Sequence, residues 1–424
     1  MTNIDDLHIE SEILPLFDFT YNAMSGQSVR DIVSQPLGSI TEILFRQQVL
    51  KGFMGNREIL KDYPYSRFNL SDVYVFFETF STGPFLGEQL RWRLRFSEKE
   101  RHRQRGKLIM LVLLFNKIHT TYLSKIDISL FPREYATDIE WINLFFTDFN
   151  LPYYESIFKK KGKLRISHMV QLMRILTEKS LNGQAESFWR RWSLFEAYLS
   201  ISDGIVKNQF EFPSFEESTF SMQGLFHPLI KNPVRNDLRA VKNVILLTGP
   251  NMSGKSTLLK AVSLCVYLGH TGLAVPATNV KMPFFTTISV AINLTDSIVS
   301  GYSHFMSEII TLKNVLSQAI TNKKCFAVFD ELFRGTNIED AMEISTMTIK
   351  GLLQFKDSLF IISTHLHQLR EIDEIKSGKV STFYIECELN NDNPAFTYKL
   401  KEGWSDLRLG RVLFEREGLN TMLE

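Results

Sequence analysis

The sequence predicts an all-α half, residues 1–208, followed by an α/β domain with a mostly parallel sheet, residues 209–424. Helical periodicity marks the first half, because between 184 and 205 the large apolar residues recur mostly at spacings of three and four. The polar stretch 208–221 separates the halves. The second half has short apolar runs between longer helical stretches, which is typical of strands buried on both faces of a parallel sheet. These runs are 244–247, 326–329 and 359–362.

Four residues in the first half are expected to interrupt its helices. Proline lacks the backbone N–H that a helix interior uses and costs about 3 kcal/mol there. Glycine also weakens a helix interior. The four residues, all between positions 85 and 205, are Gly106, Pro132, Pro152 and Gly162. We therefore expect no long, uninterrupted lever helices in this interval.

The composition is that of a globular chain with room for two domains. With 424 residues, 44% hydrophobic and 22% charged, it excludes a wholly disordered or fibrous protein. The longest apolar run, 108–115, is far shorter than the roughly 20 residues that cross a bilayer, so we expect no membrane partner. The acidic N-terminus lacks the features of a signal peptide, and the three cysteines form no close pair. The sequence therefore predicts an intracellular, cytoplasmic protein without a disulfide framework or zinc site.

Basic residues are concentrated in two stretches, although the net charge of the chain is only +1. The segment from Arg91 to Lys107 contains eight basic and two acidic residues, and a second basic cluster covers 159–165. Cations that neutralise phosphates release condensed counterions, so either stretch could contact nucleic acid. Either could equally be a solvated helix face. The charge pattern alone leaves both interpretations open.

A glycine-rich loop links the apolar run 244–247 to a helical stretch, 258–268. In this strand, loop and helix context, backbone N–H groups can surround phosphate oxygens at the positive end of the helix. We expect Lys255 to reach the β- and γ-phosphates of a nucleotide and the Ser256 hydroxyl to ligate Mg²⁺. The loop fits the pattern GxxxxGK[ST] through Gly249, Pro250, Asn251, Met252, Ser253, Gly254, Lys255, Ser256 and Thr257.

Polar residues follow the next two apolar runs at the points where their strands should end. Asp330 and Glu331 come directly after 326–329, and His365 follows 359–362. The carboxyl ends of parallel strands line the crevice where ligands bind. We therefore expect Asp330 to hold Mg²⁺ through water and Glu331 to polarise the attacking water. His365 is expected to donate to the γ-phosphate and so to report its presence.

Four segments in this order resemble the MutS family of DNA mismatch-repair ATPases, within the ABC-type ATPase class. The resemblance covers roughly residues 224–410 and extends more weakly to 20–24, TYNAM, which looks like the start of the helical core domain of that family. It implies an α/β P-loop NTPase domain of ABC type, preceded by an all-α MutS-core-like domain. The segments are 246–257 (LLTGPNMSGKST, Walker A), 301–308 (GYSHFMSE, signature), 329–336 (FDELFRGT, Walker B) and 363–369 (STHLHQL, histidine switch).

The resemblance also implies a composite site, in which the ATPase domains of a homodimer enclose two ATP molecules. Ser303 of one subunit would then contact the γ-phosphate bound to the other. Val234 lies in a segment similar to the adenine-side loop of the family, near the position that packs the base. Ser253 and Phe333 depart from the family pattern, since each stands where the family usually has glycine. Because the core-like segment begins near residue 20, we expect neither a mismatch-reading nor a connector domain in this sequence.

The leading functional hypothesis is a compact MutS-like ATPase. Mg-ATP binding would close a homodimer, and the helical half would couple closure to duplex, mismatched or branched DNA, or to a repair-protein partner. The alternative is an ATP-driven protein-interaction switch that does not touch DNA, and charge reversal across 91–107 would separate the two. A transporter-type ABC ATPase is disfavoured, because no LSGGQ-type signature occurs.

Overall fold

The chain folds into two compact units, each described here by itself. In this computed structural model the described residues are 4–61, 63, 67–80, 87–292, 304–322, 324–333, 335–390, 393–405, 407, 414, 416 and 419–423. The helical unit comprises Leu14–Ile32 and Phe45–Lys207. The α/β unit comprises Met1–Ile13, Val33–Leu44 and Asn208–Glu424, so two short N-terminal segments group by contact with the second half of the chain. An all-helical first part followed by α/β sheets confirms the predicted fold class at this level.

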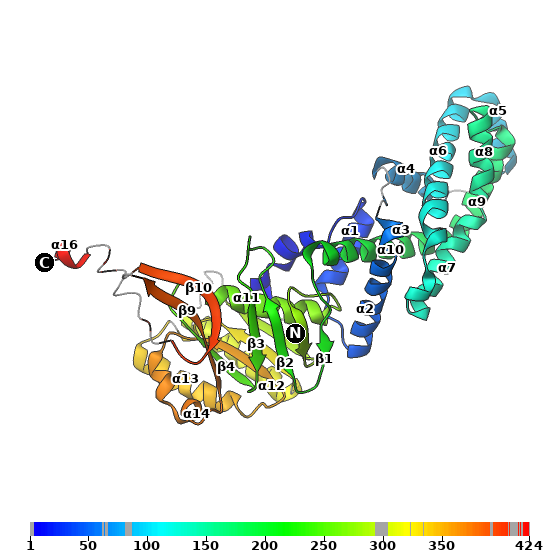
Figure 1. Ribbon diagram of the computed structural model, residues 1–424. Helices are drawn as coiled ribbons and strands as arrows, with labels where there is room; N and C mark the ends of the chain where they lie inside the picture. Colours follow the sequence, from blue (N-terminus) through cyan, green and yellow to red (C-terminus); the bar gives the residue numbers. More distant parts are fainter. Residues whose placement is uncertain are drawn as a thin grey trace. The chain divides into compact units, whose positions relative to one another are not determined.

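Aromatic side chains form the core of the helical unit. Phe115, Phe146, Phe188 and Trp192 are fully buried, and the rings of Phe145 and Phe188 stack with centroids 4.2 Å apart. Such ring pairs add to the free energy gained by burying apolar area. The helices that carry this core and its surroundings (Figure 1) are α1 Ala23–Ser34, α2 Ile40–Gly55, α3 Arg57–Leu60, α4 Arg67–Glu78, α5 Gly87–Phe96, α6 Glu98–Lys117, α7 Arg133–Thr147, α8 Leu151–Lys161, α9 Ile166–Leu181 and α10 Gln184–Asn208.

Three of the four expected helix interruptions lie at helix ends. Pro132 precedes α7, Pro152 lies in the first turn of α8, and Gly162 ends α8 with a left-handed φ of +64°. The expectation was wrong for Gly106, because it lies inside α6, which is continuous over 20 residues. Apart from the chain neighbours and the backbone of its own helix, no atom of the described residues lies within 4 Å of where a Cβ of Gly106 would be, so no close packing requires a glycine there. Apolar side chains buried after it in α6 offset the cost of about 1 kcal/mol that glycine imposes on a helix.

The α/β unit is built on a six-stranded sheet with the order β10-β9-β4-β8-β7-β6. The strands from β9 to β6 are parallel, and β10 pairs antiparallel to β9 at the edge. Every residue of β4, β7 and β8 is buried, as the three apolar runs predict, and β6 is buried throughout as well. The bounds are β4 Val244–Thr248, β6 Thr287–Ala291, β7 Cys325–Phe329, β8 Leu359–Ser363, β9 Ser381–Asn390 and β10 Asn393–Glu402.

Helices and a second sheet complete this unit (Figure 1). Leu312 and Val315 of α12, and Ile349 of α13, share one apolar cluster with alternate residues of β4, β7 and β8. The helices are α11 Lys255–His270, α12 His304–Asn322, α13 Ile338–Leu352, α14 Asp373–Lys376 and α16 Leu419–Leu423. The smaller sheet has the order β1-β5-β2-β3, with bounds β1 Ser214–Phe215, β5 Thr278–Met282, β2 Phe220–Leu225 and β3 Asn236–Ala240. Within the described ranges, none of the helices has the length and apolar character needed to cross a bilayer.

His270, the last residue of α11, is a buried neutral imidazole. Its Nε2 accepts a hydrogen bond from the Phe285 backbone N–H at 2.8 Å, so Nδ1 carries the proton and donates to the Val266 carbonyl at 2.7 Å. Burial lowers the pKa of His270 from 6.5 to about 4. A second proton on Nε2 would also remove the acceptor that Phe285 uses. The folded α/β unit therefore disfavours protonation of this side chain.

We predict that the free energy of unfolding falls as the pH drops from about 6.5 toward 4. In this window the unfolded chain binds a proton at His270 and the folded chain does not, so acid favours unfolding by up to about 3 kcal/mol. Urea unfolding of wild type and His270→Gln at pH 7.5, 6 and 5 measures the effect. The amide of glutamine can donate and accept but does not titrate, so the variant should lose less stability than wild type on acidification. Equal losses in the two proteins would contradict the prediction.

Candidate nucleotide site

The glycine loop, residues 249–254, connects the end of β4 to the start of α11. Gly249 and Gly254 have φ values of +142° and +100°, which side chains with a Cβ rarely adopt. Gly254 also packs closely, since a Cβ there would lie 3.3 Å from the ring of Tyr398. Met252, with a φ of +67°, is strained and exposed. The loop thus leads into the N-terminus of α11, where free N–H groups and the helix dipole favour an anion.

Lys255 is the first residue of α11, and its ammonium group is held inside the loop. Its Nζ donates to the carbonyls of Gly249 at 3.0 Å and Pro250 at 3.3 Å. It also lies 3.6 Å from Oε1 of Glu331, and its side chain is only 5% exposed. A buried ammonium group needs such partners to offset its lost hydration. Phosphate oxygens are stronger acceptors of the same kind, so a bound anion could replace these contacts.

Asp330 lies directly after β7 and accepts two hydroxyl hydrogen bonds. The Ser256 hydroxyl, from the first turn of α11, donates to Oδ2, and the Ser363 hydroxyl, from the end of β8, donates to Oδ1. Ser363 also accepts from the backbone N–H of Glu331 at 2.9 Å. Ser363 thereby fixes both acidic residues. Sequence reasoning missed this serine, although its place at the end of a buried strand, two residues before His365, is a usable signal.

Glu331 and His365 lie beside Lys255. Oε2 of Glu331 is 4.0 Å from Nδ1 of His365, and the imidazole is half-exposed. Glu331 has a left-handed φ of +53°, which costs free energy in a residue other than glycine. Strained backbone of this kind often occurs at functional sites. One ammonium, two carboxylates, two hydroxyls and one imidazole therefore converge at the carboxyl ends of β4, β7 and β8.

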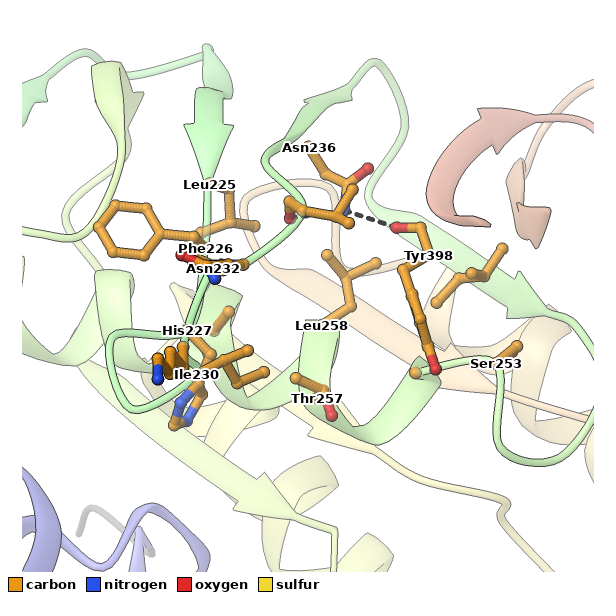
Figure 2. Close-up of a pocket in the computed structure, with 16 residues that line it drawn as sticks. Leu225, Phe226, His227, Ile230, Asn232, Asn236, Ser253, Thr257, Leu258 and Tyr398 are labelled. Carbon is orange, nitrogen blue, oxygen red and sulfur yellow. Dashed lines mark hydrogen bonds between the residues drawn. The ribbon is translucent and has the colours of Figure 1, made fainter. Parts of the chain in front are cut away.

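A pocket of about 410 Å³ opens next to the glycine loop. Figure 2 shows His227, Ile230 and Asn232 on one side, Tyr398 on the other, and Thr257 and Leu258 of α11 between them. Val234 also lines this pocket, next to the loop as expected. The Oγ of Ser253, another lining atom, is buried and has no hydrogen-bond partner among the described residues. The volume and largely apolar lining are typical of a small-ligand site.

Tyr398 is a pocket residue that the sequence did not reveal. It lies in an irregular stretch of β10, where the pairing register with β9 shifts, and has a φ of +56°. Asn236 of β3 fixes this stretch, because its Nδ2 donates to the Tyr398 carbonyl at 3.0 Å and its Oδ1 accepts from Leu400 N at 2.8 Å. The first of these contacts is drawn in Figure 2. No motif or spacing signals this bulge.

Phe333 stands where the resemblance leads us to expect glycine, and its backbone adopts a conformation that glycine favours. Phe333 has a φ of +66°, the left-handed region that favours glycine, yet its side chain is fully buried. Its ring lies 6.3 Å from that of Phe305, at the start of α12. Burying a phenylalanine contributes about 2 kcal/mol, which offsets the backbone strain. Ser303, the expected contact to a second nucleotide, lies outside the described residues.

The chain is thus an α/β protein with a glycine loop at a helix N-terminus and acidic residues at the carboxyl end of a parallel strand. Residues 245–415 match the family MutS domain V. The chain is 27% identical to DNA mismatch repair protein MutS of Fusobacterium nucleatum over 74% of this chain and 36% of that protein. It is also 27% identical to the protein of the same name from Persephonella marina, over 77% of this chain and 39% of that protein. Its identity to the protein of that name from Listeria monocytogenes serotype 4b is 32%, over 50% of this chain and 25% of that protein. Together these matches support a MutS-family protein, and the chain spans between a quarter and two-fifths of the length of these relatives.

Proposed function

We propose that this chain is a MutS-type ATPase that binds and hydrolyses Mg-ATP and couples its nucleotide state to DNA binding. The observation that carries the proposal is the convergence of Lys255, Ser256, Asp330, Glu331 and His365 beside the glycine loop and its pocket. The family match supports the same function, because the relatives are named DNA mismatch repair proteins.

The pocket and the loop would hold the two ends of ATP. The triphosphate would lie on the backbone N–H groups of Gly249–Thr257 at the start of α11. The base would enter the pocket between Val234 and Tyr398. Tyrosine adds the aromatic face that valine lacks, and such a face stacks well on a purine. The unpartnered Ser253 hydroxyl would gain a hydrogen-bond partner when the nucleotide binds.

Ser256 and Asp330 would hold Mg²⁺. Both are oxygen donors, which this ion prefers, and they already touch each other. When bound, the ion neutralises negative charge on the β- and γ-phosphates. Ser363 would keep the Asp330 carboxylate in position through its hydroxyl.

Hydrolysis would depend on positioned charges. Lys255, now 3.6 Å from Glu331, would turn to the phosphates and stabilise the charge on their oxygens. Glu331 would then orient the attacking water and help to remove its proton. Water oxygen bonds to the γ-phosphorus as the bond to the bridging oxygen breaks, giving ADP and phosphate. His365 would donate to the γ-phosphate.

The proposal also covers the domain organisation, the dimer and the surface that contacts DNA. We propose an ABC-type P-loop fold over 209–424, a helical core or lever domain over 1–208, and a homodimer in which Ser303 completes the partner site. DNA would contact the helical domain through its basic stretches. A repair protein is a further possible partner.

The test is DNA binding by the 424-residue chain carrying Glu331→Gln, with and without Mg-ATP. Fluorescence anisotropy would compare a perfect duplex, a mismatched duplex and a four-way junction at two salt concentrations. We expect nucleotide-dependent binding that prefers one DNA form and weakens as salt rises. ATP binding without affinity for any DNA form would instead favour a protein-interaction switch.

A further inference from the structure

Two large aromatic side chains are exposed side by side on α5. Trp92 is 61% exposed and Phe96 is 73% exposed, whereas the aromatic residues of the neighbouring core are buried. Their rings stack almost in parallel, with centroids 5.2 Å apart and an interplanar angle of 6°. Leu94, on the opposite side of the helix, is fully buried and anchors α5 to the helical unit. The pair therefore forms a solvent-facing platform that the packing of this unit does not use.

Exposed cationic residues are neighbours of this platform in the sequence. Arg91, Arg95 and Lys99 are exposed, and none forms an ion pair with a described residue. The nearby carboxylates have other partners. Glu98 lies 4.0 Å from Arg101 and 3.6 Å from His102, and Glu100 lies 2.9 Å from Arg103. We call Arg91, Trp92, Arg95 and Phe96 of α5 the α5 face; it carries positive charge next to open aromatic rings, and Lys99 follows in the first turn of α6.

The corner between α5 and α6 holds this face in place. Arg101 donates to the carbonyls of Leu94 at 3.2 Å and Arg95 at 3.3 Å, which satisfies two carbonyls in the last turn of α5. The Ser97 hydroxyl caps α6 by accepting from Glu100 N at 3.2 Å. α5 also packs against α6 and α9 (Figure 1). Because the backbone at this corner is fixed, binding would order few additional groups.

We infer that the α5 face binds DNA strands with unpaired bases. An aromatic face stacks on any exposed base, and neighbouring cations contact the phosphates on either side of it. In a fully paired duplex the base faces are hidden within the stack, so the aromatic pair would distinguish unpaired from paired DNA. The inference rests on the proposed DNA-binding function and adds the class of DNA and the surface that takes it. An acidic peptide would satisfy the cations but would leave the aromatic pair without a stacking partner.

The test uses the full chain without nucleotide and two fluorescent probes, single-stranded oligothymidylate and a perfect duplex of equal length. We expect Trp92→Ala/Phe96→Ala to weaken single-strand binding about 10- to 100-fold and to change duplex binding by no more than about twofold. The salt dependence should persist because the cations remain. Phe96→Tyr keeps an aromatic ring and should bind as wild type does. Arg91→Glu/Arg95→Glu should weaken binding to both probes and reduce the salt dependence.

Unchanged single-strand affinity in the double aromatic variant would overturn the inference. So would an equal loss for both probes, which would indicate a purely electrostatic surface, or a wild-type protein that binds neither probe. Thermal unfolding would verify that the variants fold, which we expect because both rings are exposed. ATP binding and turnover, measured on the same preparations, test the proposed function separately. Aromatic-dependent single-strand binding in a protein without ATPase activity would uphold the α5 face and reject only the nucleotide site.

Discussion

Lys255→Ala is expected to abolish tight ATP binding. The ammonium group is almost fully buried at the N-terminus of α11, and its position within the glycine loop allows it to reach a bound phosphate. Removing one member of a buried charge pair costs about 3–5 kcal/mol, or roughly a 150- to 5,000-fold loss of affinity. Calorimetry or a fluorescent ATP analogue would measure it.

The matched control is Lys350→Ala. Lys350 lies on α13, half-exposed and 3.8 Å from Glu374, so its loss should leave ATP affinity unchanged. The Lys255 variant also leaves Glu331 without its nearest cation, and thermal unfolding must therefore accompany the titration. A folded Lys255→Ala protein with wild-type ATP affinity would rule out the assigned nucleotide site.

The sequence predicts those parts of the fold that local patterns determine. The runs 244–247, 326–329 and 359–362 are confirmed as strands β4, β7 and β8 of one parallel sheet, because continuous burial leaves a strong apolar signal. Pro132 and Pro152 mark helix starts, since proline is tolerated in a first turn. The interruption predicted at Gly106 was wrong, because burial of the apolar residues after it outweighs the weak preference of glycine against a helix.

The candidate site likewise contains residues that the sequence predicts and residues that it does not. Lys255, Asp330 and Glu331 can be selected from the sequence, because a glycine loop and acidic strand ends are local features. Ser363 acquires its contacts only when β8 pairs with β7, and Tyr398 reaches the pocket only through a register shift in β10. Pairing register and bulges depend on contacts between distant segments, so a single sequence does not specify them.

Glu331→Gln is expected to retain ATP binding and to slow hydrolysis by about 100- to 10,000-fold. Glutamine has nearly the same shape, and the backbone N–H at this position can still donate to Ser363. The amide cannot accept a proton from water, so the step that requires a base should fail. The loss of charge also frees Lys255 from its 3.6 Å contact, which should leave ATP affinity equal to or higher than that of wild type. Phosphate release and ATP titration, measured on the same protein, separate the two effects.

Glu339→Gln is the matched control, because Glu339 is an exposed carboxylate in the first turn of α13 and should not affect turnover. If ATP binding closes a homodimer, the Glu331 variant should also accumulate as a dimer in the presence of Mg-ATP, which light scattering would detect. Normal turnover in Glu331→Gln would show that this carboxylate is not the base. The contact between Glu331 and Lys255 would then have a structural role, and hydrolysis would require another group to orient the water.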